Sequence, residues 1–292
     1  MSRTKKAVII GSVLVGIGVI IGFIGIAIGG FKFPNGAVDL TTMKALHAEK
    51  KTVQIADAFD KIEIAGASSM DIEICKSKTG KNYVEYYDTD DWTSYVDVKE
   101  HVLKFITDDK GKHKAVVSLG FGKDTAARLY LADAEYKEIA VTTLSGYVTI
   151  QDVNAETVNV SASSGDLYMR NINAPDSIMA TSSSGDIDLE NATAKQIELG
   201  ANSGDIEMQD ITAESLRMST SSGDIDLESC DAEKFDITTS SGDVDMEITA
   251  GHTYRFDTKT NSGAVDVPDG DADSDYLCKI VTSSGDVDVK QK

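Results

Sequence analysis

The sequence is poor in the residues from which most catalytic and metal sites are built. Its 292 residues include three cysteines, four histidines, three prolines and one tryptophan. The cysteines form no CxxC pair and the histidines no HExxH motif, which argues against a disulfide framework and a structural zinc site. These counts leave few of the usual parts of an enzyme, so we predict no catalytic residue, no metal site and no cofactor.

Basic residues are scarce as well. The chain has 28 lysines and arginines against 48 aspartates and glutamates, which gives a net charge of −20 and an isoelectric point near 4.5. Binding to nucleic acid phosphates needs basic patches, so we exclude nucleic acid as a partner. Cations and basic surfaces fit this charge.

A long hydrophobic run occurs near the start, at residues 7–30, and it contains no charge and one hydroxyl, Ser12. As a helix it would reach roughly 36 Å, enough to cross a hydrocarbon core of about 30 Å. Arg3, Lys5 and Lys6 precede the run. The positive-inside rule therefore predicts a single-pass cell-membrane protein with a short cytoplasmic tail, residues 1–6, and an extracellular C-terminal part.

Glycines in this predicted span follow a helical spacing. Gly18 and Gly22 form one GxxxG pair, and Gly25 and Gly29 form another. Such pairs allow close helix packing and predict a possible homodimer through the span. A flexible anchor that stays monomeric is the alternative.

The second half of the chain is an internal repeat. A Ser-Gly pair recurs at steps of 19 to 22 residues, and its glycines are Gly146, Gly165, Gly185, Gly204, Gly223, Gly242, Gly263 and Gly285. The second and fourth residues after each glycine are apolar, and those between them are mostly acidic. This alternation predicts strands, since neighbouring side chains of a strand point to opposite faces.

These observations predict an all-β fold, a β-solenoid of about eight coils of 19–22 residues, preceded by one transmembrane helix. A single repeat cannot bury its own apolar face, whereas stacked coils share one core. Helical and leucine-rich repeats are excluded because their periodicities are absent. The acidic loop at residues 268–275 lacks the spacing of an EF-hand, so we interpret it as a solvated loop.

The same patterns divide the rest of the chain. Residues 31–57 are polar and predict a juxtamembrane linker. Residues 59–137 carry aromatic-rich strand patterns and predict a β-region that starts and caps the solenoid, with an independent domain as the alternative. Within it, residues 67–74 (ASSMDIEI) resemble a degenerate coil in which Met70 replaces glycine. Residues 138–292 form the acidic repeat, with 30 acidic and 9 basic residues, a balance of −21.

Stacking turns the acidic positions into ladders. The first ladder directly follows the glycines and contains Asp166, Asp186, Asp205, Asp224, Asp243, Ala264 and Asp286. The second ladder lies two residues later and contains Asp188, Glu207, Asp226, Asp245, Asp266 and Asp288. Neighbouring carboxylates would lie about 5 Å apart and repel each other by roughly 1 kcal/mol per pair in water.

Each ladder has a structural and a functional interpretation. Aspartates of the first ladder can accept backbone hydrogen bonds in turns. The second ladder can be a solvated face that keeps the protein soluble, or a stripe that binds cations or a cationic peptide. Threonines before the glycines predict inward hydroxyl ladders rather than nucleophiles; they are Thr220, Thr239, Thr260 and Thr282. Cys230 and Cys278 lie at apolar repeat positions and are expected to pack as small hydrophobes.

Residues 55–292 resemble the bacterial adhesin-like family DUF4097. The likeness lies in FDKIEI, SSMDIEI, YVEYY and ARLYLADAEYKEIAV, followed by the tandem SSGDIDLE units. It implies a β-solenoid in a bacterial cell envelope, without established catalytic residues, and for some members a link to envelope stress. Gly146-Tyr147 and Gly263-Ala264 depart from the pattern because the aspartate after glycine is lost.

We therefore expect a membrane-anchored extracellular binding module with a multivalent acidic face. Its expected partner is a cation, a cationic peptide, a cell-wall polymer or an envelope protein. One alternative is a structural or regulatory envelope protein that docks on a membrane partner. A β-helix enzyme acting on acidic polysaccharide is less favoured, because an acidic surface would repel such a substrate.

Overall fold

The computed structural model describes residues 49–88, 92–109, 126–249 and 251–292, all of which belong to one compact unit, Ala48–Lys292. Within these residues the chain forms an eighteen-stranded sheet and no helix. The described part thus offers no helix able to cross a membrane. The predicted span at 7–30 and its packing glycines lie outside these residues.

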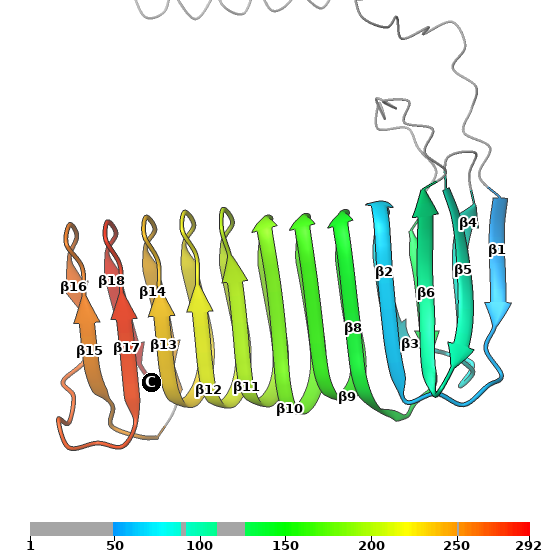
Figure 1. The fold of residues 1–292 in the computed structure, drawn as a ribbon. Helices are drawn as coiled ribbons and strands as arrows, with labels where there is room; N and C mark the ends of the chain where they lie inside the picture. Colours follow the sequence, from blue (N-terminus) through cyan, green and yellow to red (C-terminus); the bar gives the residue numbers. More distant parts are fainter. Residues whose placement is uncertain (1–48, 89–91, 110–125, 250) are drawn as a thin grey trace, which may run out of the picture. The chain divides into compact units, whose positions relative to one another are not determined.

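The repeat folds into stacked parallel coils, which confirms the predicted β-solenoid of about eight turns (Figure 1). Five of the long strands begin two residues after a glycine, and each of these ends at or shortly before the next Ser-Gly pair. Neighbouring strands pair in register, so that Ile187 faces Ile206 and Ile206 faces Ile225. The strands are β8 (Glu135–Ser145), β9 (Val148–Ser164), β10 (Leu167–Ser184), β11 (Ile187–Ala201), β12 (Ile206–Ser219) and β13 (Ile225–Thr238).

The core forms because the period-2 alternation places one set of side chains inside every coil. Ile187 and Leu189 are at most 1% exposed, and the same two positions are buried in the other long coils. Alanines recur nine residues after the first five glycines, and four of them, including Ala155 and Ala174, are also buried. One continuous hydrophobic cluster runs through the stack, as expected for coils that cannot bury their apolar faces alone.

The Ser-Gly corner needs glycine because neighbouring coils approach closely there. A Cβ on Gly165, or on any later corner glycine, would lie 1.9–2.3 Å from the carbonyl oxygen of the glycine in the adjacent coil. No side chain fits at that distance. The buried hydroxyl three residues before the glycine donates to the same carbonyl, as Thr220 Oγ1 does to Gly204 O at 3.1 Å. The predicted hydroxyl ladders are therefore structural, but they bond to glycine carbonyls rather than to one another.

A second corner, which we did not predict from the sequence, lies six residues after each of the first five repeat glycines. Its residues have a left-handed backbone with φ between 51° and 58°: Asp152, Asn171, Asn191, Asp210 and Ser229. Asparagine and aspartate tolerate this conformation better than most residues. Their side chains also bond along the stack, since Asn171 Nδ2 donates to Asp152 Oδ1 at 2.6 Å. The signal in the sequence was the recurrence of Asn or Asp at this register.

The C-terminal coils do not stack in chain order, which corrects the expected order of both ladders. The chain leaves β14 (Val244–Ile248), builds the outermost coil from β15 (Arg255–Lys259) and β16 (Val265–Asp266), and then returns. On its return, β17 (Leu277–Val281) lies between β13 and β15, and β18 (Val287–Gln291) lies between β14 and β16. Residues 251–254 and 267–276, which belong to the connections between these strands, form no strand themselves.

The N-terminal strands show the same kind of insertion. The coil of β2 (Lys61–Ser69) and β3 (Ile72–Lys76) lies between β8–β9 on one side and β6 (Val102–Asp109) with β7 (Ala127–Leu131) on the other. A Cβ on Gly146 would lie 2.5 Å from Met70 O. Met70 therefore occupies the place of the next corner glycine, which confirms that residues 67–74 are a degenerate coil.

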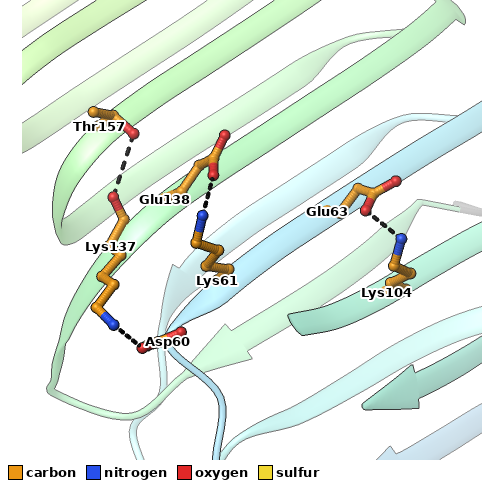
Figure 2. Close-up of polar contacts among 7 residues, drawn as sticks. All are labelled: Asp60, Lys61, Glu63, Lys104, Lys137, Glu138 and Thr157. Carbon is orange, nitrogen blue, oxygen red and sulfur yellow. Dashed lines mark hydrogen bonds and ion pairs between the residues drawn. The ribbon is translucent and has the colours of Figure 1, made fainter. Parts of the chain in front are cut away.

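Antiparallel strands complete this end of the stack. They are β1 (Glu49–Gln54), β4 (Tyr83–Asp88) and β5 (Trp92–Lys99), where β1 pairs with β4, β4 with β7, and β5 with β6. Ion pairs join β2 to both of its neighbours, Lys104–Glu63 at 2.6 Å and Lys61–Glu138 at 3.1 Å (Figure 2). The described strands before and after residue 138 thus share one sheet, while the predicted domain boundaries stay predictions.

Candidate functional site

The first aspartate ladder joins the coils to each other. The Oδ1 atom of Asp205 accepts the backbone N–H of Asp224 in the next coil at 2.8 Å, and the same bond recurs between the other neighbours at 2.7–3.0 Å. Each of these carboxylates therefore has a structural role, although across coils rather than within one turn. One carboxylate oxygen of each is engaged in this way.

Two coils carry no aspartate at the position of the first ladder, and the surroundings of these two positions differ. Ala264 N donates to Asp286 Oδ1 at 2.7 Å, and its coil is the outermost of the stack. An aspartate at this position would have no further coil to join among the described residues. Tyr147 N donates to Asp71 Oδ1 at 2.9 Å, so Asp71 extends the ladder into the N-terminal coil. Tyr147 itself interrupts the line of carboxylates.

The second ladder forms a straight line of acidic side chains across paired strands. Asp188, Glu207, Asp226 and Asp245 face one another in register on β11, β12, β13 and β14. Asp288 comes next and Asp266 last, because β18 is inserted before β16. Six carboxylates thus follow one another at the strand spacing of about 4.8 Å.

A surface groove of about 470 Å³ runs over this ladder. Tyr168 lies at one end and Lys290 at the other, according to the strand order. The acidic lining combines the second ladder with residues two positions further along the same strands. These lining carboxylates are Asp188, Glu190, Glu207, Asp226, Glu228, Asp245 and Glu247.

Three of these lining residues escaped the sequence analysis: Glu190, Glu228 and Glu247. They lie five residues after the glycine, on the outward face that the second ladder shares, because side chains two residues apart point to the same side of a strand. The alternation itself was the signal that could have found them.

Basic side chains neutralise the edges of the groove but not its centre. Arg170 Nη2 lies 3.3 Å from Glu190 Oε1, Lys290 Nζ lies 3.1 Å from Asp288 Oδ1, and Lys292 Nζ lies 2.7 Å from Glu247 Oε2. Among the described residues, no ion pair involves Asp188, Glu207, Asp226 or Asp245. The middle of the groove is therefore a concentration of negative charge.

Burial and the neighbouring carboxylates change the pKa of Asp188. Desolvation, followed by the charges of Glu207, Asp186 and Asp166, raises the pKa of Asp188 to about 6. Desolvation and the charges of Asp245 and Glu207 also raise the pKa of Asp226, although its side chain is more exposed. A bound cation would relieve both the repulsion and the lost hydration.

Within the described ranges, no three His, Cys, Asp or Glu side chains form a group that could hold a metal ion. Cys230 and Cys278 are buried in the core and Cys75 is partly buried, each as a free thiol. Burial raises the pKa of the Cys230 and Cys278 thiols to about 12, consistent with unreactive core residues.

The predicted binding residues are thus divided by the structure. Asp186, Asp205, Asp224, Asp243 and Asp286 lie at the Ser-Gly corner and bond to backbone. Asp188, Glu207, Asp226 and Asp245 line the groove, whereas Asp288 and Asp266 continue the ladder beyond it.

Comparisons with known proteins agree with this architecture. The family model described as Toastrack DUF4097 matches residues 59–290. A solved structure of a candidate adhesin from Bacteroides fragilis is similar with a TM-score of 0.52 and 17% identity, covering 84% of this chain and 97% of that one. A candidate lipid-binding protein from Parabacteroides distasonis has a TM-score of 0.50 and 18% identity, covering 83% and 96%. These likenesses concern the fold. No curated protein matches the chain.

Proposed function

The chain belongs to the Toastrack DUF4097 family, and we propose that it is a membrane-anchored, extracellular binding module that is not an enzyme. The adhesin name of a structural neighbour supports a binding role, and the charge-free run at residues 7–30 supports the anchor. In this proposal the N-terminus is cytoplasmic and the solenoid lies outside the cell.

The acidic groove is the observation that most strongly supports a binding role. Four carboxylates without an ion pair among the described residues follow each other in register, and like charges opposite one another destabilise a sheet. A solubilising surface does not need such an arrangement, since scattered charges serve that purpose equally well. We infer that the groove binds a partner that supplies positive charge along the ladder.

The partner that fits this shape is an extended cationic peptide. The groove is an open line rather than a closed cage, and its described residues offer no chelating group. Lysine or arginine side chains on a strand-like peptide recur every two residues, about 6.6 Å apart, so several of them can reach the ladder at once. Binding of this kind is multivalent, weak at each site and sensitive to salt.

The test is calorimetry of the full-length protein with hexalysine at low and high salt. We expect saturable binding that weakens at least tenfold in high salt. A variant with Asp188→Asn, Glu207→Gln, Asp226→Asn and Asp245→Asn should lose it. The control is a variant with Glu156→Gln, Asp176→Asn, Glu214→Gln and Glu233→Gln, which removes the same charge from exposed positions outside the groove lining.

Equal binding by both variants would show that net charge alone attracts the peptide. No binding by the parent protein would leave the acidic face as a solvation device. The structural role, in which the solenoid docks on an envelope protein, would then become the leading function.

A further inference from the structure

One corner of the stack differs from all the others in its surface chemistry. Leu144 and Tyr147 flank the first Ser-Gly pair and are 56% and 60% exposed. The later coils carry serine or asparagine at the first of these positions, and aspartate or alanine at the second. Two large apolar side chains therefore stand at the point where the line of corner carboxylates is interrupted.

The described chain begins at the same edge of the stack. Glu49 pairs with Asp88, and the register through β4, β7, β3 and β9 places Glu49 level with the Ser-Gly corner. The edge where β8 ends is also the edge where β1 starts (Figure 1). Four strand spacings, about 19 Å, separate Glu49 from Tyr147.

The connection to the predicted anchor is short. Residues 31–48 separate the hydrophobic run from Glu49, so Glu49 lies no farther than about 65 Å from the end of that run, the reach of 18 fully extended residues. The spacing of about 19 Å between Glu49 and Tyr147 is well within that reach. A solenoid tethered this way presents its N-terminal Ser-Gly corner near the lipid surface at a high effective concentration.

Negative charge opposes contact between the later corners and an anionic bilayer. Further along the edge stand Asp166, Asp186 and the later carboxylates of the first ladder, which an anionic bilayer repels. Leucine and tyrosine are suited to the interface, since tyrosine combines an apolar ring with a polar hydroxyl.

We propose that Leu144 and Tyr147 form a membrane-contact corner that docks the solenoid on the outer surface of the bilayer in which the chain is anchored. This inference rests on the anchor in the proposed function, but not on the cationic ligand.

The sequence of the repeat supplies a matched variant. Leu144→Ser with Tyr147→Asp introduces residues that other coils carry at these two positions. An aspartate at position 147 would also continue the corner ladder, so this variant should unfold at no lower denaturant concentration than its parent. Loss of docking can then be separated from loss of folding.

The experiment uses the full-length protein in vesicles of phosphatidylcholine and phosphatidylglycerol at 3:1, in a Cys75→Ser background. A bimane label is placed through Ser163→Cys, one strand from Leu144, or through Ser240→Cys, the same exposed position five strands away. Lipids carrying a doxyl quencher should quench the first label at least threefold more than the second. The Leu144→Ser, Tyr147→Asp variant should remove that difference.

Equal quenching of both labels, or a difference that persists in the variant, would overturn the proposal. So would shielding of the Ser163→Cys label in detergent without lipid, because a protein segment or a second copy would then cover the corner. Release of the protein from vesicles by alkaline carbonate would instead contradict the anchor, and so the proposed function itself.

Discussion

Lys279 Nζ lies 3.2 Å from Asp236 Oδ1, although 43 residues separate them. The contact exists because β17 is inserted between β13 and β15. On this outward face the charges alternate through Glu198, Arg217, Asp236, Lys279 and Asp257. Stacking in chain order would have placed Asp257 beside Asp236. The inserted order therefore avoids a like-charge contact on this face, while the opposite face keeps its acidic ladder.

The first prediction tests this ion pair by reversing the charge at position 279. Lys279→Glu places three acidic residues in succession and should lower the free energy of unfolding by about 1 kcal/mol at low salt. Lys234→Glu is the control, since it makes the same charge change at an exposed site on the neighbouring strand. Urea unfolding at two salt concentrations measures both. Equal effects of the two substitutions would contradict the role assigned to the Asp236 contact.

The second prediction concerns glycine at the corner. Gly204→Ala places a Cβ 2.2 Å from Gly185 O, so the coils must separate, and we expect a loss of about 3 kcal/mol. Gly200→Ala is the matched control in the same coil, because its Cβ would be 3.6 Å from the nearest atom, Ser219 Oγ. The control should stay within about 1 kcal/mol of the parent. Thermal unfolding distinguishes the two, and similar melting temperatures would argue against close coil contact.

The third prediction separates hydrogen bonding from charge in the first ladder. Asp205→Ala removes the acceptor of the Asp224 N–H and should lower the free energy of unfolding by about 1 kcal/mol. Asp205→Asn keeps an oxygen in the same place and should retain most of that stability. If the asparagine variant were as unstable as the alanine variant, the carboxylate charge, and not the hydrogen bond, would matter at this corner.

The fourth prediction follows from the raised pKa of Asp188, about 6 in the folded protein. An unfolded aspartate titrates near 4, so between about pH 4 and 6 the folded state binds the proton more tightly. This residue therefore lowers stability above pH 6, and the loss is relieved as the pH falls toward 4. The effect is on the order of 1 kcal/mol once solvent screening at this partly exposed site is included.

Asp188→Asn should raise stability at pH 7.5 and leave it nearly unchanged at pH 4. Urea unfolding of both proteins across this range measures the difference. An equal gain at both pH values would show that the substitution acts through packing rather than through the carboxylate charge.

Several features of the fold could be read from local patterns. The Ser-Gly period predicted the coils, and the apolar residues two and four positions after glycine predicted the core. Met70 could be recognised as a corner because the residues around it match the repeat. The left-handed corner at Asn171 and Asn191 was not predicted, because asparagine tolerates a left-handed backbone but does not require one. The groove carboxylates Glu190 and Glu228 were not predicted, because the strand between them carries an uncharged residue, Gln209, at the same position.

The sequence by itself determined the kind of fold, because a period of about 19 residues with strand alternation leaves every coil with an apolar face that only another coil can cover. Only the tertiary structure decided which coils are neighbours. Register is set by the pattern within a coil, and each coil presents nearly the same edge, so stacking β17–β18 before or after β15–β16 satisfies the same backbone hydrogen bonds. That choice depends on contacts such as Lys279 with Asp236, between residues far apart in the chain. It also determines that Asp288, and not Asp266, follows Asp245 along the acidic ladder.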